Sequence, residues 1–124
     1  MSIVEIFEEK EDVIAGKGVS IEMIVEAERE LNISFAEEYR EYLLKYGLIM
    51  CCGHELTGLG KSVRTNVVHV TKQMKQIKSG IPEDWYVLEN ENMDGAIIWQ
   101  DTRGNVYFNT KKVYSSLSEF AQDF

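Results

Sequence analysis

The sequence predicts a single α+β domain, in which N-terminal helices pack on a mostly antiparallel sheet and a short helix ends the chain. Three observations indicate this class: helical periodicity before Gly47, strand-like runs after Trp85, and a further helical pattern after Ser116. The 124 residues, 44% of them hydrophobic, suffice for one globular core. Because no Pro-rich linker or internal repeat divides the chain, we expect one domain over residues 1–124.

The N-terminal segment is expected to form a helix from Ile3 to about Ile14. Ile3, Phe7 and Ile14 share one side of that helix, which ends before Gly16-Lys17-Gly18. Ser20 is a good N-cap for a second helix. The apolar stripe of this second helix consists of Ile21, Ile24, Val25 and Leu31.

Glu28 lies within that stripe, between Val25 and Leu31. A carboxylate on an apolar face is costly unless hydrogen bonds satisfy it. We therefore expect Glu28 to be structural, substantially buried, and bonded to backbone or hydroxyl donors. The alternative is a partner-binding or catalytic acid, but a carboxylate without a second acid, a histidine or a metal ligand beside it is rarely catalytic.

The third predicted helix starts with a capping box of Ser34 and Glu37. It ends at Gly47, a residue that readily takes the left-handed conformation. Its apolar face consists of Phe35, Tyr39, Tyr42, Leu43 and Tyr46. We interpret the tyrosines as core and rim packing, since each can bury its ring while the hydroxyl finds one partner.

Short strands and one helix are expected next. Residues 48–61 are apolar and punctuated by glycine, which favours one or two strands with loops. Val70, Met74 and Ile77 have helical spacing, so a helix is expected at about residues 71–79. Residues 85–89 then form a strand-like run.

A hairpin and a helix complete the predicted domain. Residues 96–100 and 105–109 flank Asp101-Thr102-Arg103-Gly104, which is typical of a β-hairpin with glycine at the left-handed position. A capping box of Ser116 and Glu119 begins the last helix. The stripe of this helix consists of Leu117, Phe120, Ala121 and Phe124.

Two short motifs are incomplete versions of ligand-binding sequences. Gly58-Leu59-Gly60-Lys61-Ser62 ends like a phosphate-binding loop, but Glu55 stands where that loop has its first glycine. Cys51-Cys52-Gly53-His54 falls short of a zinc site, because His69 is the only other histidine and there is no second cysteine pair. We therefore expect no metal, nucleotide or other cofactor, and we interpret both cysteines as small core residues. A small hydrolase with Cys51 or Cys52 as nucleophile is the least favoured alternative.

Acidic side chains outnumber basic ones by 21 to 13, which gives a net charge of −8. Residues 1–46 hold twelve acids and five bases, residues 47–80 one and five, and residues 81–124 eight and three. Such a surface repels nucleic acids and anionic membranes and favours encounter with a basic protein. An equally good interpretation is that the acidic side chains only keep the protein soluble. Without a signal peptide or an apolar run of membrane-span length, we expect a cytoplasmic protein.

A family pattern is visible in the run Ile24…Ala27-Glu28…Leu31…Ile33…Phe35…Tyr39…Leu43…Tyr46-Gly47. This run resembles the N-terminal signature of the SUKH superfamily, the SMI/KNR-like domains. Residues 81–85, 101–107 and 118–120 resemble the remaining elements of the family in the same order, so the likeness covers most of residues 20–124. Two places depart from the family pattern: Ala36 stands where proline is usual, and residues 48–52 replace a Gly-rich stretch.

The resemblance implies a noncatalytic α+β protein-binding domain. In bacteria such proteins are mostly immunity proteins, or antitoxins, that bind and neutralise a cognate polymorphic toxin, often a nuclease; in eukaryotes they are interaction modules. The matching positions look like architecture, and they are Glu28, Tyr39, Tyr46, Gly47 and Gly104. We expect an immunity protein for a basic, nuclease-type toxin, and the alternative is an intracellular SMI/KNR-type interaction module without a toxin partner.

The predicted partner surface is the sheet region that combines aromatic and acidic side chains next to a turn at residues 92–95. Buried aromatic anchors supply affinity at protein interfaces, and carboxylates speed encounter with a basic partner. The residues of this surface are Trp85, Tyr86, Glu89, Glu91, Asp94, Trp99 and Asp101. The alternative is that the tryptophans are core residues and the acids a solvated rim.

Overall fold

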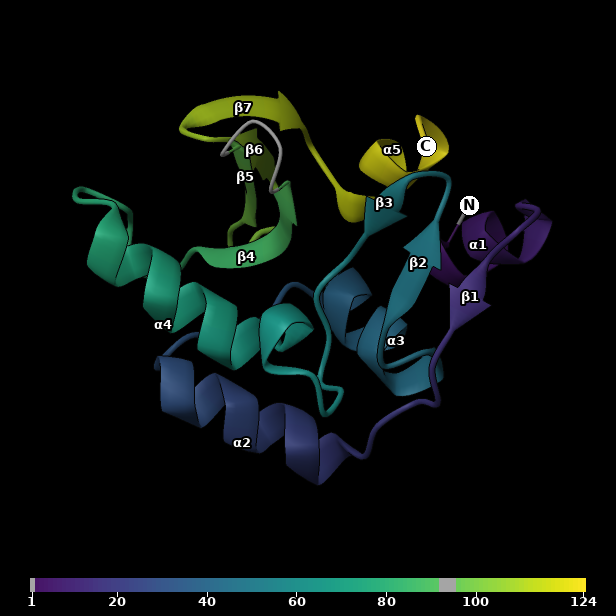
Figure 1. Ribbon diagram of the computed structural model, residues 1–124, viewed down its shortest axis with the longest axis horizontal. Helices are drawn as coiled ribbons and strands as arrows, with labels where there is room; N and C mark the ends of the chain where they lie inside the picture. The colour runs from purple at the N-terminus through teal and green to yellow at the C-terminus, as the bar shows by residue number, and fades with distance from the viewer. Residues whose placement is uncertain (1, 92–95) are drawn as a thin grey trace.

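The computed structural model describes residues 2–91 and 96–124, apart from the side chain of Glu91. Within these residues the chain forms five α-helices, a 3₁₀ turn and two antiparallel sheets, which confirms the predicted α+β class (Figure 1). The helices are α1 (Ile3–Glu9), α2 (Ile21–Leu31), α3 (Glu37–Lys45), α4 (Val67–Ile77) and α5 (Leu117–Gln122), with the 3₁₀ turn η1 at Val63–Thr65. The strands are β1 (Ile14–Ala15), β2 (Ile49–Cys51), β3 (His54–Glu55), β4 (Tyr86–Glu91), β5 (Ala96–Gln100), β6 (Val106–Phe108) and β7 (Lys111–Tyr114).

The strands are divided between a sheet with the order β1-β2-β3 and a sheet with the order β4-β5-β6-β7. The two sheets meet where the chain leaves β3, because the Thr57 N–H donates to the Leu88 carbonyl of β4 at 2.7 Å. Figure 1 shows α4 running along β4, α2 lying beside α4, and α1 at the far side of the three-stranded sheet. Helices therefore cover the strands on several sides.

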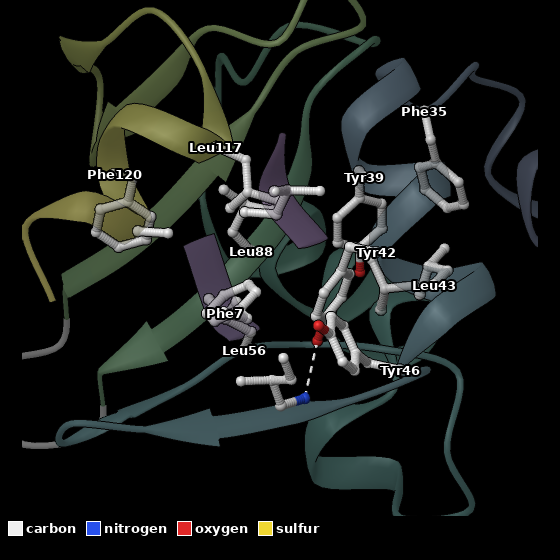
Figure 2. Close-up of a cluster of buried hydrophobic side chains, with 14 of the residues drawn as sticks. Phe7, Phe35, Tyr39, Tyr42, Leu43, Tyr46, Leu56, Leu88, Leu117 and Phe120 are labelled. Carbon is white, nitrogen blue, oxygen red and sulfur yellow. Dashed lines mark hydrogen bonds between the residues drawn. The ribbon is translucent and has the colours of Figure 1, made fainter. Parts of the chain in front are cut away.

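The main core lies where α1, α3 and α5 meet strands β2 and β4 (Figure 2). Phe35 and the apolar face of α3 are buried there as predicted, with Tyr39, Tyr42 and Leu43 fully inaccessible. A second, smaller cluster lies between α4 and the four-stranded sheet, and it consists of Val70, Met74, Trp85, Val87, Ile97 and Trp99. Side chains of β4 alternate between the two clusters, so this strand is buried on both faces.

Buried tyrosine hydroxyls are satisfied by Thr57 and nearby backbone groups. The Tyr42 hydroxyl donates to the Thr57 carbonyl at 2.8 Å and accepts from the Ile49 N–H at 3.1 Å, the dashed line in Figure 2. The Tyr39 hydroxyl lies 2.9 Å from the Thr57 hydroxyl, which itself donates to the Val87 carbonyl at 2.7 Å. Burial raises the pKa of both phenols well above the ordinary value. They are packing residues with paired hydroxyls, as expected.

Three helix boundaries differ from the prediction. The first helix ends at Glu9 instead of about Ile14, because Ile14 pairs with Met50 in the three-stranded sheet and is 67% exposed. Helix α3 has Ala36 as its N-cap, so the predicted Ser34 and Glu37 capping box is wrong. Helix α4 begins at Val67, four residues before the expected start, because the Asn66 side chain accepts from the N–H groups of Val68 and His69.

The apolar stripe predicted for α2 is only partly correct. Ile24 and Ala27 face the interior, whereas Ile21 and Val25 are 64% and 45% exposed. Helix α2 contacts both α3 and α4, and its buried side is set by this packing and not by the stripe that the sequence suggests. Ser20 caps α2 as predicted, accepting from the Met23 N–H at 3.2 Å.

The last helix, α5, is fixed to α3 by a contact that the sequence pattern does not reveal. The Glu38 carboxylate accepts hydrogen bonds from the N–H groups of Leu117 and Ser118 and from the Ser118 hydroxyl. Ser116 caps this helix by accepting from the Glu119 N–H at 3.0 Å, but the Glu119 carboxylate accepts from the Ser115 N–H at 2.9 Å, so only half of the predicted capping box forms. An anion at a helix N-terminus is favoured by unpaired N–H groups and by the helix dipole. Glu38 therefore anchors the C-terminal helix to the core.

Candidate partner-binding groove

The three aromatic residues of the predicted partner surface lie in the interior. Trp85 and Trp99 are 7% and 1% exposed in the second cluster, and Tyr86 is fully buried in the main core. The Trp85 ring stacks on Tyr107 with centroids 3.9 Å apart. Their burial agrees with the alternative that the tryptophans are core residues, because β4 and β5 are covered on both faces by packed elements.

Asp101 and Glu89 are buried carboxylates with structural partners. The Asp101 carboxylate accepts hydrogen bonds from the backbone N–H groups of Arg103 and Asn105, from the side-chain amide of Asn105 and from the Tyr107 hydroxyl. Together these bonds hold the turn between β5 and β6. Burial opposes its ionisation, but these hydrogen bonds outweigh that effect and lower the pKa of Asp101. Glu89 lies 2.9 Å from the His54 ring and accepts from the Glu55 N–H at 3.1 Å, so it joins β4 to β3.

The remaining two residues of that predicted surface lie beyond what the structure describes. The side chain of Glu91 and the whole of Asp94 fall outside the described residues, as does the predicted turn at residues 92–95. The seven residues thus do not form one exposed acidic and aromatic patch: five are buried, and the other two have no described side chain.

The positions that match the family serve the scaffold. The Glu28 side chain is 12% exposed and accepts from the Phe35 N–H at 2.7 Å and from the Arg40 guanidinium at 2.6 Å. Gly47 has a left-handed φ of 69°, as predicted. Gly104, with φ of 100°, donates its N–H to the Asp101 carbonyl at 3.0 Å in the hairpin turn. Tyr39 and Tyr46 are buried core residues.

An open groove of about 610 Å³ lies between α2 and α4, the two helices that Figure 1 shows side by side. Its apolar part is formed by Met23 and Ala27 of α2, Val68 of α4 and Leu59 of the preceding loop. Met23 is 46% exposed and lies beside the apolar Ala27, Leu59 and Val68 in the groove lining. Its polar rim consists of Glu22, Glu26, Glu30, Asn66, His69 and Lys72.

Negative charge surrounds the α2 side of this groove. Glu22, Glu26 and Glu30 project from α2, whereas Lys72 is the only lysine or arginine in the groove lining. Lys72 lies 3.7 Å from Glu30, and Glu26 pairs with the exposed Arg29 at 2.7 Å. Exposed pairs of this kind contribute little to stability and are screened by salt. The groove is therefore an apolar strip beside an acidic helix, complementary to an apolar side chain flanked by basic ones.

The residues of the incomplete ligand motifs are engaged within the fold. The N–H groups of Gly58 and Leu59 donate to the carbonyls of Thr65 and Gly47, which directs them away from an anion. Cys51 and Cys52 form a disulfide, and only Cys51 is a core residue as expected, since Cys52 is exposed. In the part of the chain that the structure covers, no three His, Cys, Asp or Glu side chains gather as a metal-holding group, and no helix has the length and apolar content of a membrane span.

Fold and groove together define the class: a small α+β domain whose apolar concave surface lies between two helices at its periphery. The chain belongs to the SUKH_5 family, described as SMI1-KNR4 cell-wall, whose family model matches residues 1–124, the whole chain. No curated protein matches the sequence. The SMI1-KNR4 assignment agrees with the resemblance found in the sequence, and proteins of this family are generally noncatalytic.

Proposed function

We propose that this protein is an immunity protein that binds a cognate toxin domain and neutralises it in the cytoplasm. The observation that carries the proposal is the apolar groove between α2 and α4 with its acidic rim, in a family of interaction domains and in a chain of net charge −8. A nuclease-type toxin must attract phosphates and is therefore basic near its active site. An acidic inhibitor speeds encounter with such a surface and competes directly with the nucleic acid.

The groove is the proposed docking site for the toxin. Met23 and Val68 offer apolar contact area, and Glu22 and Glu26 offer charge on the adjacent helix face. None of these side chains takes part in the hydrogen bonds that fix α2 to α3, which run through Glu28. Glu22, Met23 and Glu26 are exposed and lie outside the main core cluster, so substitutions at these three positions change the surface with little effect on the fold. The proposal can therefore be tested by mutation.

The first experiment tests the function. The toxin domain encoded beside this gene is expressed from an inducible promoter, with and without this protein, and cell growth is followed. Restored growth together with a stable complex of the two purified proteins is the expected result. Growth arrest despite co-expression, or absence of a complex, would overturn the proposal. A gene without a neighbouring toxin would favour the alternative, an SMI/KNR-type interaction module, for which the SMI1-KNR4 family description provides the support.

The second experiment tests the groove. Replacement of both Glu22 and Glu26 by lysine should slow association with the toxin by about tenfold and reduce its salt dependence. The matched control replaces Glu9 and Glu11, exposed acids on or just after α1, by lysine and changes the net charge equally. Met23→Ala should speed dissociation, whereas Met50→Ala on β2, also an exposed methionine, should not. If the control replacements changed association and dissociation as much as the groove replacements do, the toxin would bind elsewhere.

A further inference from the structure

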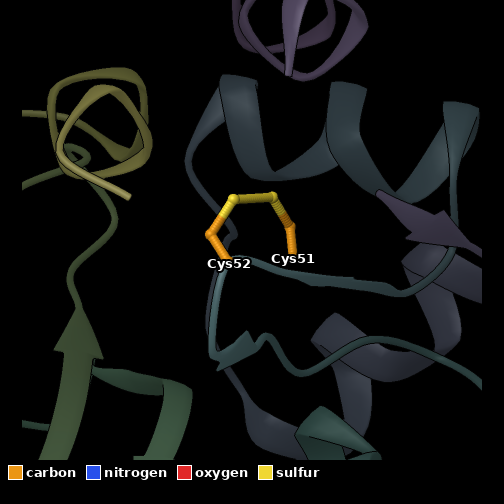
Figure 3. The surroundings of a disulfide bond; sticks show 2 residues. All are labelled: Cys51 and Cys52. Atoms are coloured by element: carbon orange, nitrogen blue, oxygen red, sulfur yellow. A yellow bond between two sulfur atoms is a disulfide. The ribbon is translucent and has the colours of Figure 1, made fainter. Parts of the chain in front are cut away.

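The hairpin between β2 and β3 places two cysteines at its tip. Cys51 ends β2 and pairs with His54, the first residue of β3, so that Cys52 and Gly53 form the two-residue turn. Both turn residues have positive φ, 57° for Cys52 and 84° for Gly53, as a tight hairpin turn requires. Figure 3 shows the two side chains curling toward one another, with their sulfur atoms joined in a disulfide.

The two cysteines have different access to solvent. Cys51 is 3% exposed and belongs to the main core cluster, whereas Cys52 is exposed at the tip of the turn. A shallow pocket of about 340 Å³ lies against the turn and is lined by Ile14, Met50 and His54 as well as by both cysteines. A small molecule in this pocket therefore reaches the exposed Cys52 more readily than Cys51, which is only 3% exposed.

We propose that Cys51 and Cys52 are a thiol–disulfide exchange site for low-molecular-weight disulfides and thiols of the glutathione class. In the oxidising direction the Cys52 thiolate attacks one sulfur of the disulfide RSSR, which gives a Cys52–S–S–R mixed disulfide and one RSH after protonation. The Cys51 thiolate then attacks the Cys52 sulfur and displaces the second RSH. In total two cysteine thiols and RSSR become one protein disulfide and two RSH, and the reverse reaction consumes two RSH.

The roles of the two sulfurs follow from their positions. Nucleophilic attack on an external disulfide requires an accessible thiolate, which favours Cys52 as the entry point. Because Cys51 is the adjacent residue on the same hairpin, it resolves the mixed disulfide without large motion of the chain. This inference is independent of the toxin-binding proposal.

Intact-mass spectrometry with oxidised glutathione tests the proposal. The full-length protein is first reduced and freed of reductant. The mass of the wild type should fall by that of two hydrogens as the disulfide forms, and a glutathione adduct should be seen only transiently. Cys51→Ala should accumulate one adduct, and Cys52→Ala should gain it at least about tenfold more slowly, since its remaining thiol is buried. Equal rates in the two variants, or a lasting adduct in the wild type, would overturn the assignment.

A second measurement does not depend on whether the variants fold. The reduced wild type is treated briefly with iodoacetamide, and the modified positions are found by peptide mapping. Alkylation of Cys52 before Cys51 is the expected result. Alkylation of Cys51 first, or of both at one rate, would contradict the proposed roles.

Discussion

Glu28 on α2 and Phe35, which precedes α3, are joined by a 2.7 Å hydrogen bond from the Phe35 backbone N–H to the Glu28 carboxylate. The same oxygen pairs with the Arg40 guanidinium of α3 at 2.6 Å. One side chain thus fixes the angle between two successive helices. It also satisfies a backbone donor in the segment where the predicted serine cap does not form.

Glu28→Ala should lower the free energy of unfolding by about 1–3 kcal/mol, because the Phe35 N–H and Arg40 both lose their acceptor. Urea denaturation followed by circular dichroism measures this loss. Glu26→Ala is the matched control on the same helix, since its pair with Arg29 is exposed and should contribute no more than about 0.5 kcal/mol. Equal stability of the Glu28→Ala variant and the wild type would contradict the structural role.

Asp101→Asn should make stability less dependent on pH. The folded pKa of Asp101 is lowered, so its stabilising contribution is fully present above the ordinary carboxyl value of 3.8 and is lost as the pH falls through the lower folded pKa. The variant should be less stable than the wild type by about 1–3 kcal/mol at pH 7. The difference should shrink below about pH 4. The control Glu9→Gln, an exposed acid, should show no such convergence.

Thr57→Val and Thr65→Val should have opposite consequences although both threonines are buried. The Thr57 hydroxyl accepts from Tyr39 and donates to the Val87 carbonyl, so its removal should cost about 1–3 kcal/mol. Among the residues that the structure describes, the Thr65 hydroxyl has no hydrogen-bond partner, so valine there should be neutral or stabilising. Thermal and urea unfolding measure the stability of each variant relative to the wild type. A larger loss of stability for Thr65→Val than for Thr57→Val would contradict this prediction.

Gly47→Ala should destabilise the protein much more than Gly80→Ala. Both glycines have left-handed φ, 69° and 78°, so alanine is strained at either position by about 1 kcal/mol. A Cβ at Gly47 would also clash with the Lys17 carbonyl oxygen, whereas the space beside Gly80 is open. We expect a loss of about 3 kcal/mol or more for Gly47→Ala. Similar midpoints of urea denaturation for the two variants would contradict this.

Features set by local pattern were predictable from the sequence. The α3 face with Tyr39 and Tyr42, the left-handed Gly47 and the hairpin around Gly104 all follow from helical spacing or glycine conformation. Glu28 was also identifiable, because a carboxylate on an apolar face must find hydrogen-bond donors.

Features set by long-range packing were not predictable. Trp85 and Trp99 looked available for a partner, but their burial depends on α4 covering β4 and β5, which no local pattern indicates. The exposure of Ile21 and Val25 likewise depends on how α2 is turned toward α3 and α4. The groove was missed for the same reason, since Leu59 and Met23 come together only in the folded chain. The excess of acids before Gly47 was its only signal in the sequence.

The position of Thr57 has a consequence for hydrogen exchange. Its amide, hydroxyl and carbonyl bond to β4 and α3, segments that come from distant parts of the chain. The amide proton at Thr57 should therefore exchange with deuterium only when the whole domain opens, whereas amides in the outer turns of α2 exchange through local fraying. The outer turns of α2, beside the proposed docking groove, can therefore fluctuate while the centre of the domain stays closed.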